Sequence, residues 1–105
     1  MLDISRCALT GTISPTIGQL NNLEILLLHG NKDLTGTIPI QLGNLSMLTN
    51  MYLNNCSLTG TIPTTIGQMY NLQYLILYGN PELTGSIPIA LGTLSRLIEL
   101  DLYDC

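Results

Sequence analysis

The chain has 105 residues, of which 46% are hydrophobic and only 10% are charged, so most side chains must pack against one another rather than meet water. Its formal charge is −4, and its three basic residues, Arg6, Lys32 and Arg96, are scattered along the sequence. This pattern argues against a nucleic-acid partner and against attraction to a membrane surface, and the aliphatic run at 25–28 is far too short for direct membrane insertion.

The first predicted element is a short strand near the start of the chain. Leu2-x-Ile4-x-x-Cys7 places apolar residues at alternate positions, which is typical of a strand with one buried face. The phrase Leu-Thr-Gly-Thr-Ile follows at residues 9–13. The strand pattern then returns in a longer form, Leu-x-x-Leu-x-Leu-x-x-Asn, at residues 23–31.

Both patterns recur in the same order to the end of the chain. The Leu-Thr-Gly phrase returns at 34–38, 58–62 and 83–87, and the strand pattern returns at 48–56, 72–80 and 97–105. Successive copies are 24 or 25 residues apart. A fixed period of this length indicates supersecondary units stacked in a solenoid, in which each unit contacts only its neighbours.

The strand pattern matches L-x-x-L-x-L-x-x-N/C-x-L, so the chain resembles a leucine-rich repeat protein. The extension Leu-Thr-Gly-x-Ile-Pro-x-x-Ile/Leu-Gly, which begins at residues 34, 58 and 83, is similar to the plant-type subclass. That subclass is found in receptor-like kinases, receptor-like proteins and polygalacturonase-inhibiting proteins. The resemblance implies an α/β solenoid, a leucine-rich repeat superhelix with a parallel concave sheet, short second strands and 3-10 or short helical turns on the convex side.

Proline and glycine recur at fixed positions in the convex half of the repeats. We expect Pro39, Pro63 and Pro88 to fix φ for the first turn of each helical segment. Glycines at 43, 67 and 92 fit a tight reversal of the backbone or a close contact between coils.

One position after each strand is filled by asparagine or cysteine. A buried asparagine here can bond the backbone of neighbouring turns, so we predict a structural ladder formed by Cys7, Asn31, Cys56, Asn80 and Cys105. The cysteines are 49 residues apart, which makes the repeating unit a pair of repeats. Cysteines two strands apart would lie roughly 10 Å from each other, beyond disulfide reach, so we expect buried, reduced thiols and no metal site.

The whole chain, 1–105, is predicted to be one leucine-rich repeat fragment of about four repeats. It starts and ends on a strand, and no polar capping repeat is recognisable at either end. Solenoids normally need caps for solubility. We therefore expect continuation into further repeats or end-to-end stacking on another copy.

The sequence contains few residues in arrangements that favour catalysis. The single histidine, His29, is expected at an outward, exposed position, and no serine or cysteine lies in a recognisable nucleophile motif. Glu99, Asp101 and Asp104 cluster on the last strand, where a solvated acidic face is the simpler interpretation than a cation site. We expect no catalytic residue, no cofactor and no enzyme activity here, although a kinase domain could lie elsewhere in a parent chain.

The outward residues of the predicted strands would form columns on the concave face. Four of the five tyrosines fall on that face, next to isoleucine and leucine side chains that we expect to be exposed. Large side chains with polar tips suit interfaces, so we predict a protein or peptide ligand. The predicted ligand-binding residues are Ile25, Leu27, His29, Asn50, Tyr52, Asn54, Tyr74, Ile76, Tyr78, Glu99, Asp101 and Tyr103.

The sequence leaves the wider role open. The favoured interpretation is part of a cell-surface receptor, as an extracellular or plasma-membrane ectodomain, with a cytoplasmic scaffold as an alternative because the cysteines are unpaired. A secreted inhibitor of a cell-wall hydrolase is a second reading. A third is ice binding by a stacked threonine array, formed by Thr10/Thr12, Thr35/Thr37, Thr59/Thr61 and Thr84/Ser86.

Two glycosylation sequons are present. Asn44-Leu-Ser46 is expected on a convex turn, where a glycan would fit. Asn55-Cys-Ser57 is expected beside the buried ladder and therefore unused.

Overall fold

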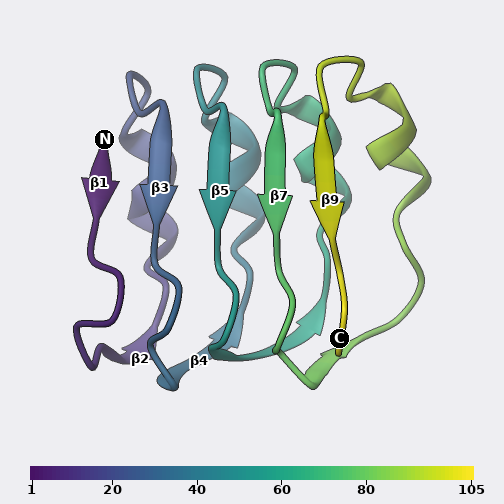
Figure 1. The fold of residues 1–105 in the computed structure, drawn as a ribbon. Coiled ribbons are helices and arrows are strands. Elements are labelled where there is room, and N and C mark those ends of the chain that lie inside the picture. The colour runs from purple at the N-terminus through teal and green to yellow at the C-terminus, as the bar shows by residue number, and fades with distance from the viewer.

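The computed structural model describes residues 1–105 as a solenoid with two parallel sheets (Figure 1). The strands of the first sheet stand side by side in chain order, one per coil. They are β1 (Leu2–Asp3), β3 (Ile25–Leu27), β5 (Asn50–Tyr52), β7 (Tyr74–Ile76) and β9 (Glu99–Asp101). Parallel strands and stacked coils confirm the predicted fold class.

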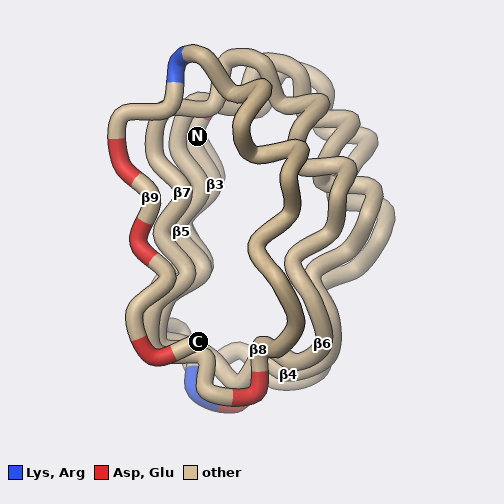
Figure 2. Tube along the Cα trace, turned by 90° about the vertical axis from the view of Figure 1, so that its right-hand side faces the viewer, with Lys and Arg blue, Asp and Glu red and all other residues tan.

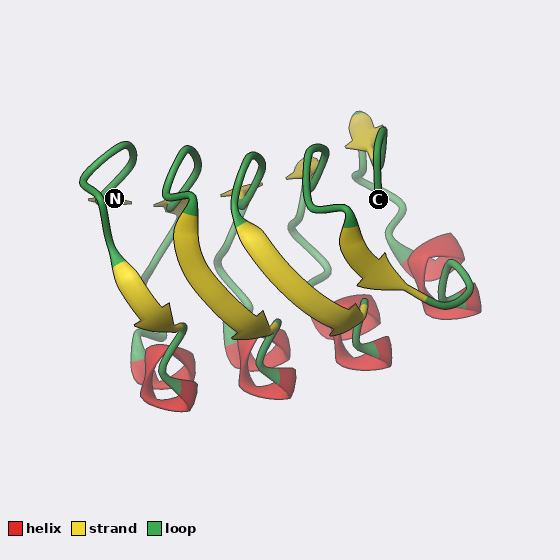
Figure 3. Ribbon diagram, turned by 90° about the horizontal axis from the view of Figure 1, so that it is seen from below, coloured by secondary structure: helices red, strands yellow, loops and turns green.

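The second half of each coil contains a short strand and a single 3-10 helix. The second sheet consists of β2 (Thr10–Thr12), β4 (Asp33–Thr37), β6 (Ser57–Thr61) and β8 (Glu82–Thr84). The helical turns are η1 (Pro15–Gln19), η2 (Ile40–Asn44), η3 (Thr64–Gln68) and η4 (Ile89–Thr93). Seen from below, the strands of the second sheet lie obliquely between the first sheet and the row of helical turns (Figure 3).

The core is a column of leucines inside the coils. Leu26, Met51 and Leu75 are opposite one another in the first sheet, and all three are fully buried. Leu53 and Leu77 follow Met51 and Leu75 by two residues in the same coils and form a second column, again fully buried. Burial of this kind stabilises each coil by roughly 1.5–3 kcal/mol per leucine, and only the neighbouring coils provide the contact surface.

The prolines do not lie where the sequence predicted. Pro39, Pro63 and Pro88 precede their helical turns, with ψ between 132° and 142°, and only Pro15 lies inside a turn. Each of the three still supports its turn through its carbonyl, since Pro39 O accepts a hydrogen bond from Leu42 N at 3.1 Å. The ring therefore sets the direction of the chain as it enters the turn, one residue earlier than expected.

A glycine in each helical turn lets the coils approach closely. A Cβ atom on Gly43 would lie only 2.5 Å from Thr65 O of the next coil, and one on Gly18 would lie 2.5 Å from Gln41 O. Gly92 belongs to the last helical turn and has nothing within 4 Å of that position. The glycines are thus explained by contact with the following coil, not by an unusual backbone angle.

The two ladder asparagines lie inside the coils and join neighbouring turns. Asn31 Oδ1 accepts hydrogen bonds from the amides of Cys7 and Leu9, both at 3.0 Å, and its Nδ2 donates to Ile4 O and Leu28 O. Asn80 repeats the arrangement two coils later. Its Oδ1 accepts from Leu58 N at 3.1 Å, and its Nδ2 donates to Leu53 O and Leu77 O at 2.9 and 2.7 Å.

The cysteines at the same position behave differently from the prediction. All three are free thiols, but only Cys56 is buried, whereas Cys7 and Cys105 are exposed because they lie in the first and last coils. The Cys56 and Cys105 thiols donate to carbonyls of preceding coils, Leu28 O at 3.5 Å and Leu77 O at 3.2 Å. Burial raises the pKa of the Cys56 thiol, which keeps it protonated as a weak donor.

Candidate functional site: the concave face

The concave sheet places the predicted ligand-binding residues in three columns. Pairing of the strands aligns Asp3, Leu27, Tyr52, Ile76 and Asp101 in the central column. The same pairing aligns Ile25, Asn50, Tyr74 and Glu99 in a second column. Backbone bonds such as Gly30 N to Asn54 O, at 2.9 Å, continue the register into a third column, which holds Ser5, His29, Asn54, Tyr78 and Tyr103.

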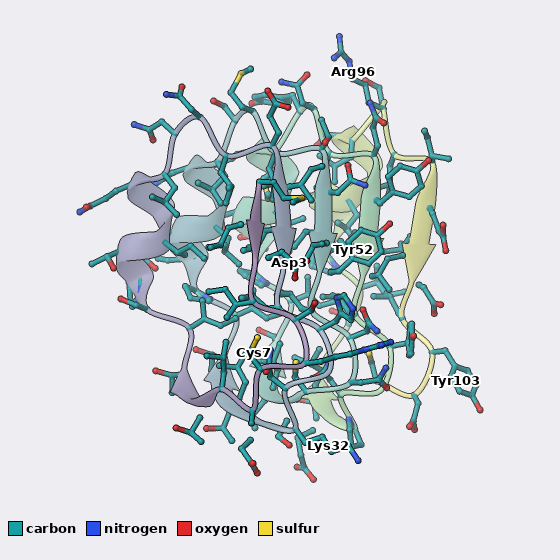
Figure 4. All side chains as sticks on the ribbon, turned by 60° about the vertical axis from the view of Figure 1, so that its left-hand side comes forward. Asp3, Cys7, Lys32, Tyr52, Arg96 and Tyr103 are labelled. Atoms are coloured by element: carbon teal, nitrogen blue, oxygen red, sulfur yellow. The ribbon has the colours of Figure 1, made fainter.

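A hollow of about 620 Å³ lies over these columns. Its walls come from β3, β5, β7 and β9, from the loops that follow β3, β5 and β7, and from Met1 and Arg6 on either side of β1, so residues up to a hundred positions apart share one surface. The lining residues are Met1, Arg6, Ile25, Leu27, His29, Gly30, Asn50, Tyr52, Asn54, Asn55, Ile76, Tyr78, Glu99 and Asp101. Figure 4 shows Tyr52 and Asp3 on this side of the sheet, while Tyr103 lies at the far rim.

Several side chains are less accessible than the sequence predicted. Ile76 is only 4% exposed, and Ile25 and Leu27 are half-buried, because the inward curve of the sheet crowds the side chains of neighbouring strands. His29 is also half-buried rather than exposed. Its ring lies 6.2 Å from that of Tyr52 at a tilt of 59°, a geometry that favours aromatic contact.

Two buried polar atoms in this hollow have no hydrogen-bond partner. They are Nδ1 of His29 and Oδ1 of Asn54, which are neighbours in the third column. Asn54 as a whole is only 5% exposed. A buried acceptor without a partner costs about 1–3 kcal/mol, so native proteins rarely retain one without a reason.

The charged side chains that line the hollow are separated along the solenoid. Arg6 lies in the loop after β1, and Glu99 and Asp101 lie on β9 at the other end, as the acidic positions along β9 in Figure 2 show. The Asp3 carboxylate is already engaged, because the hydroxyl and amide of Ser5 both donate to its Oδ1 and lower its pKa. Asp101 Oδ1 accepts from Tyr103 N at 3.0 Å in the same type of turn.

Sequence reasoning missed Arg6 and Asn55 as lining residues. They share a position with Gly30, Gly79 and Asp104, one residue before the ladder, and all five have a left-handed backbone with φ between 53° and 75°. The recurrence of glycine, asparagine and aspartate there is the signal that could have located this turn. Because Gly30 lacks a side chain, Arg6 can lie across the next coil, with its Cγ 2.8 Å from where a Gly30 Cβ would stand.

The acidic residues of the last strand form no metal centre. No group of three histidine, cysteine, aspartate or glutamate side chains is placed to hold a metal ion. The structure also contains no helix long and apolar enough to cross a bilayer.

The threonines of the second sheet form a different array from the predicted one. Concave strands pair residues 24 or 25 positions apart, whereas the second sheet pairs residues only 22 or 23 apart. In the second sheet, each strand therefore pairs two residues away from the equivalent residue of the next repeat. The paired threonines are Thr12 with Thr35, Thr37 with Thr59 and Thr61 with Thr84. Continuous columns of equivalent threonines do not form.

The threonine side chains also contribute to contacts between coils. Thr35 Oγ1 donates to Gly11 O at 3.2 Å, and Thr84 Oγ1 donates to Gly60 O at 3.4 Å. The methyl group of Thr37 lies 3.0 Å from where a Gly60 Cβ would stand. The Thr-Gly phrase thus has a structural role of its own.

Comparison with known proteins agrees with this geometry. The family described as Leucine Rich Repeat matches residues 1–20, 22–45, 47–69 and 71–94. None of the curated proteins matches the chain significantly.

Three solved structures illustrate the relatives. The leucine-rich repeat ectodomain of the Arabidopsis thaliana membrane receptor kinase GASSHO1/SCHENGEN3, in complex with Casparian strip integrity factor 2, is 43% identical over 84% of this chain and 10% of its own, with a TM-score of 0.80. The Arabidopsis receptor kinase HAESA, in complex with the peptide hormone IDA and the co-receptor SERK1, is 40% identical over 87% of this chain and 15% of its own, with a TM-score of 0.81.

The third structure is a plant ice-binding protein. It is 37% identical over 92% of this chain and 31% of its own, with a TM-score of 0.87. The chain therefore spans between 10% and 31% of the length of these three proteins.

Proposed function

The chain belongs to the leucine-rich repeat family, and we propose that it is a non-enzymatic recognition module that binds a peptide or protein segment on its concave face. The observation that carries the proposal is the hollow itself. It combines half-buried aromatic and aliphatic walls with two buried polar atoms, on His29 and Asn54, that lack partners. A preformed, mostly apolar cavity with a few polar anchors is the usual form of a binding site.

The same proposal includes a location in the plant cell. Solved relatives include the ectodomain of a plant membrane receptor kinase and a receptor kinase bound to a peptide hormone. We infer that this chain is an extracellular part of such a receptor. A secreted inhibitor of a cell-wall hydrolase would use the same face, and a reducing-sugar assay of polygalacturonase with and without the chain separates the two roles.

Tyrosine variants test the binding face directly. The probe is a library of random dodecapeptides on beads, exposed to the fluorescently labelled chain. Tyr52→Ala combined with Tyr78→Ala should abolish retention, since both rings line the hollow. Tyr70→Ala is the matched control, because Tyr70 is 65% exposed and does not line the hollow. Equal retention by all three proteins, with unchanged circular dichroism, would refute the proposal.

Ice binding is the second candidate function. It is favoured by the similarity to a plant ice-binding protein and by the exposed threonines of the second sheet. The two-residue displacement between coils and the hydroxyl bonds of Thr35 and Thr84 weaken it, because they break the regular array and engage its donors. Thermal hysteresis decides the question: an activity in the chain that is lost in Thr37→Tyr, at a position exposed on the second sheet, would establish this function.

A further inference from the structure

The charged groups around the concave hollow are arranged with a direction. Three charged side chains line it, namely Arg6 at the end near β1 and Glu99 and Asp101 on β9. Strands β3, β5 and β7 lie between these two ends. Apart from His29, the residues that these strands and their following loops contribute to the lining are uncharged. Among the lining side chains, the hollow therefore has a positive end and a negative end, because Asp3 of β1 lies outside the lining and its carboxylate accepts hydrogen bonds from Ser5.

A side chain that lines the middle of the hollow carries an unpaired hydrogen-bond acceptor. Asn54 Oδ1 is buried and unpaired, and its neighbour His29 Nδ1 is in the same condition. An N–H group of a ligand can satisfy the asparagine, and a peptide backbone carries both N–H and C=O groups for such a pair. Leu27, Tyr52 and Ile76 supply the apolar surface next to it.

The separation of the charged ends sets a length. Parallel strands are about 4.8 Å apart, so the four spacings from β1 to β9 cover about 19 Å. Arg6 extends over Gly30 of the second coil, which leaves about three spacings, or roughly 14 Å, across the strands. Arg6 also shares its position with Asp104, three residues beyond Asp101, which adds roughly 10 Å along the strand direction and brings the separation to about 17 Å. An extended chain advances about 3.4 Å per residue, so the two ends are bridged by about five residues.

From these three observations we propose that the hollow binds an extended peptide segment whose basic side chain lies over Glu99 and Asp101 and whose carboxylate lies over Arg6, about five residues away. An amide N–H of the segment donates to Asn54 Oδ1. This inference rests on the proposed function and adds the charge pattern and direction of the ligand. Complementary charge fixes orientation more than it adds affinity, so direction is the property to measure.

The experiment uses pools of bead-bound hexapeptides with acetylated and amidated ends. The first and last residues are fixed as Arg/Glu, Glu/Arg, Glu/Glu, Arg/Arg or Gln/Gln, and the four middle residues are random. We expect one of the two opposite-charge pools to retain the full chain about fivefold better than the Gln/Gln pool, since an exposed ion pair contributes up to about 1 kcal/mol. The Glu/Glu and Arg/Arg pools should each retain less of the chain than that opposite-charge pool.

A charge exchange tests the direction. In Arg6→Glu combined with Glu99→Arg, the preference should switch to the other opposite-charge pool. The matched control is Lys32→Glu combined with Glu82→Lys, an exchange of two exposed residues that do not line the hollow and that leaves the net charge unchanged. This control should keep the original preference, and a switch in both double variants would overturn the proposal.

The remaining outcomes separate this inference from the proposed function. Equal retention of all five pools would overturn the charge pattern but leave peptide binding on the concave face intact. Retention of no pool would overturn both. Asn54→Leu should weaken every pool by a similar factor while the circular dichroism spectrum is kept, and undiminished binding would remove the asparagine from the site.

Discussion

Replacing asparagine with leucine should have opposite effects on the free energy of unfolding at two buried positions of this solenoid. Asn80 and Asn54 are both nearly inaccessible, at 0% and 5% exposure. Asn80 makes three hydrogen bonds, to Leu58 N, Leu53 O and Leu77 O, whereas Asn54 Oδ1 makes none. The two substitutions therefore remove the same side chain from a satisfied and from an unsatisfied environment.

The magnitudes follow from these bonds. Asn80→Leu deletes three bonds worth about 1 kcal/mol each and leaves three buried backbone groups unpaired, so we expect a loss of about 3–5 kcal/mol in the free energy of unfolding. Asn54→Leu removes a buried acceptor that already lacks a partner. Its free energy of unfolding should stay constant or rise by about 1–2 kcal/mol.

Urea denaturation followed by circular dichroism measures both variants. The midpoint of Asn80→Leu should shift to lower urea, and the slope of the transition should stay the same, since the surface exposed on unfolding is unchanged. A loss of more than about 2 kcal/mol in Asn54→Leu would refute the claim that this asparagine is retained for binding rather than for stability.

Three further predictions concern the coils and the surface. Gly43→Ala should lower the melting temperature, because its Cβ would lie 2.5 Å from Thr65 O, whereas Gly92→Ala has open space and should leave it unchanged; equal effects in thermal melts would exclude the proposed contact between coils. The contribution of Cys56 to the free energy of unfolding should be constant below the ordinary thiol pKa of 9.0 and should fall above it, because burial raises the pKa of Cys56 and the folded state holds that proton more tightly; Cys56→Ala should lose this part of the fall at alkaline pH, and an unchanged pH profile in that variant would contradict the assignment. Secretion from plant cells should add one glycan at the exposed Asn44, visible as an endoglycosidase-sensitive mass that disappears in Asn44→Gln but persists in Asn55→Gln.

The repeat made the backbone of this protein predictable. A period of 24 or 25 residues and alternating leucines, together with the resemblance to leucine-rich repeat proteins that they carry, predicted the parallel sheet, the buried column through Leu26, Met51 and Leu75, and the three outward columns. These features depend on the local residue pattern and on stacking between neighbouring repeats, and both can be predicted from the repeat itself.

The features that the sequence did not predict depend on the curvature of the sheet and on the register between coils. Burial of Ile76 results from crowding inside the curved sheet, and the displacement of the threonines results from the register of the second sheet. Neither quantity can be read from spacing along the chain. Arg6 was missed because its place in the hollow depends on a left-handed backbone and on the absence of a side chain at Gly30.

The alternation of asparagine and cysteine in the ladder divides the solenoid into blocks. Asn31 ties the second coil to the first, and Asn80 ties the fourth to the third, each through bonds to both coils. The junctions between the second and third coils and between the fourth and fifth rely on a thiol instead, through Cys56 and Cys105. Mechanical pulling or partial unfolding should therefore open the molecule at the thiol junctions and release it in two-coil steps, which matches the 49-residue unit in which the sequence repeats.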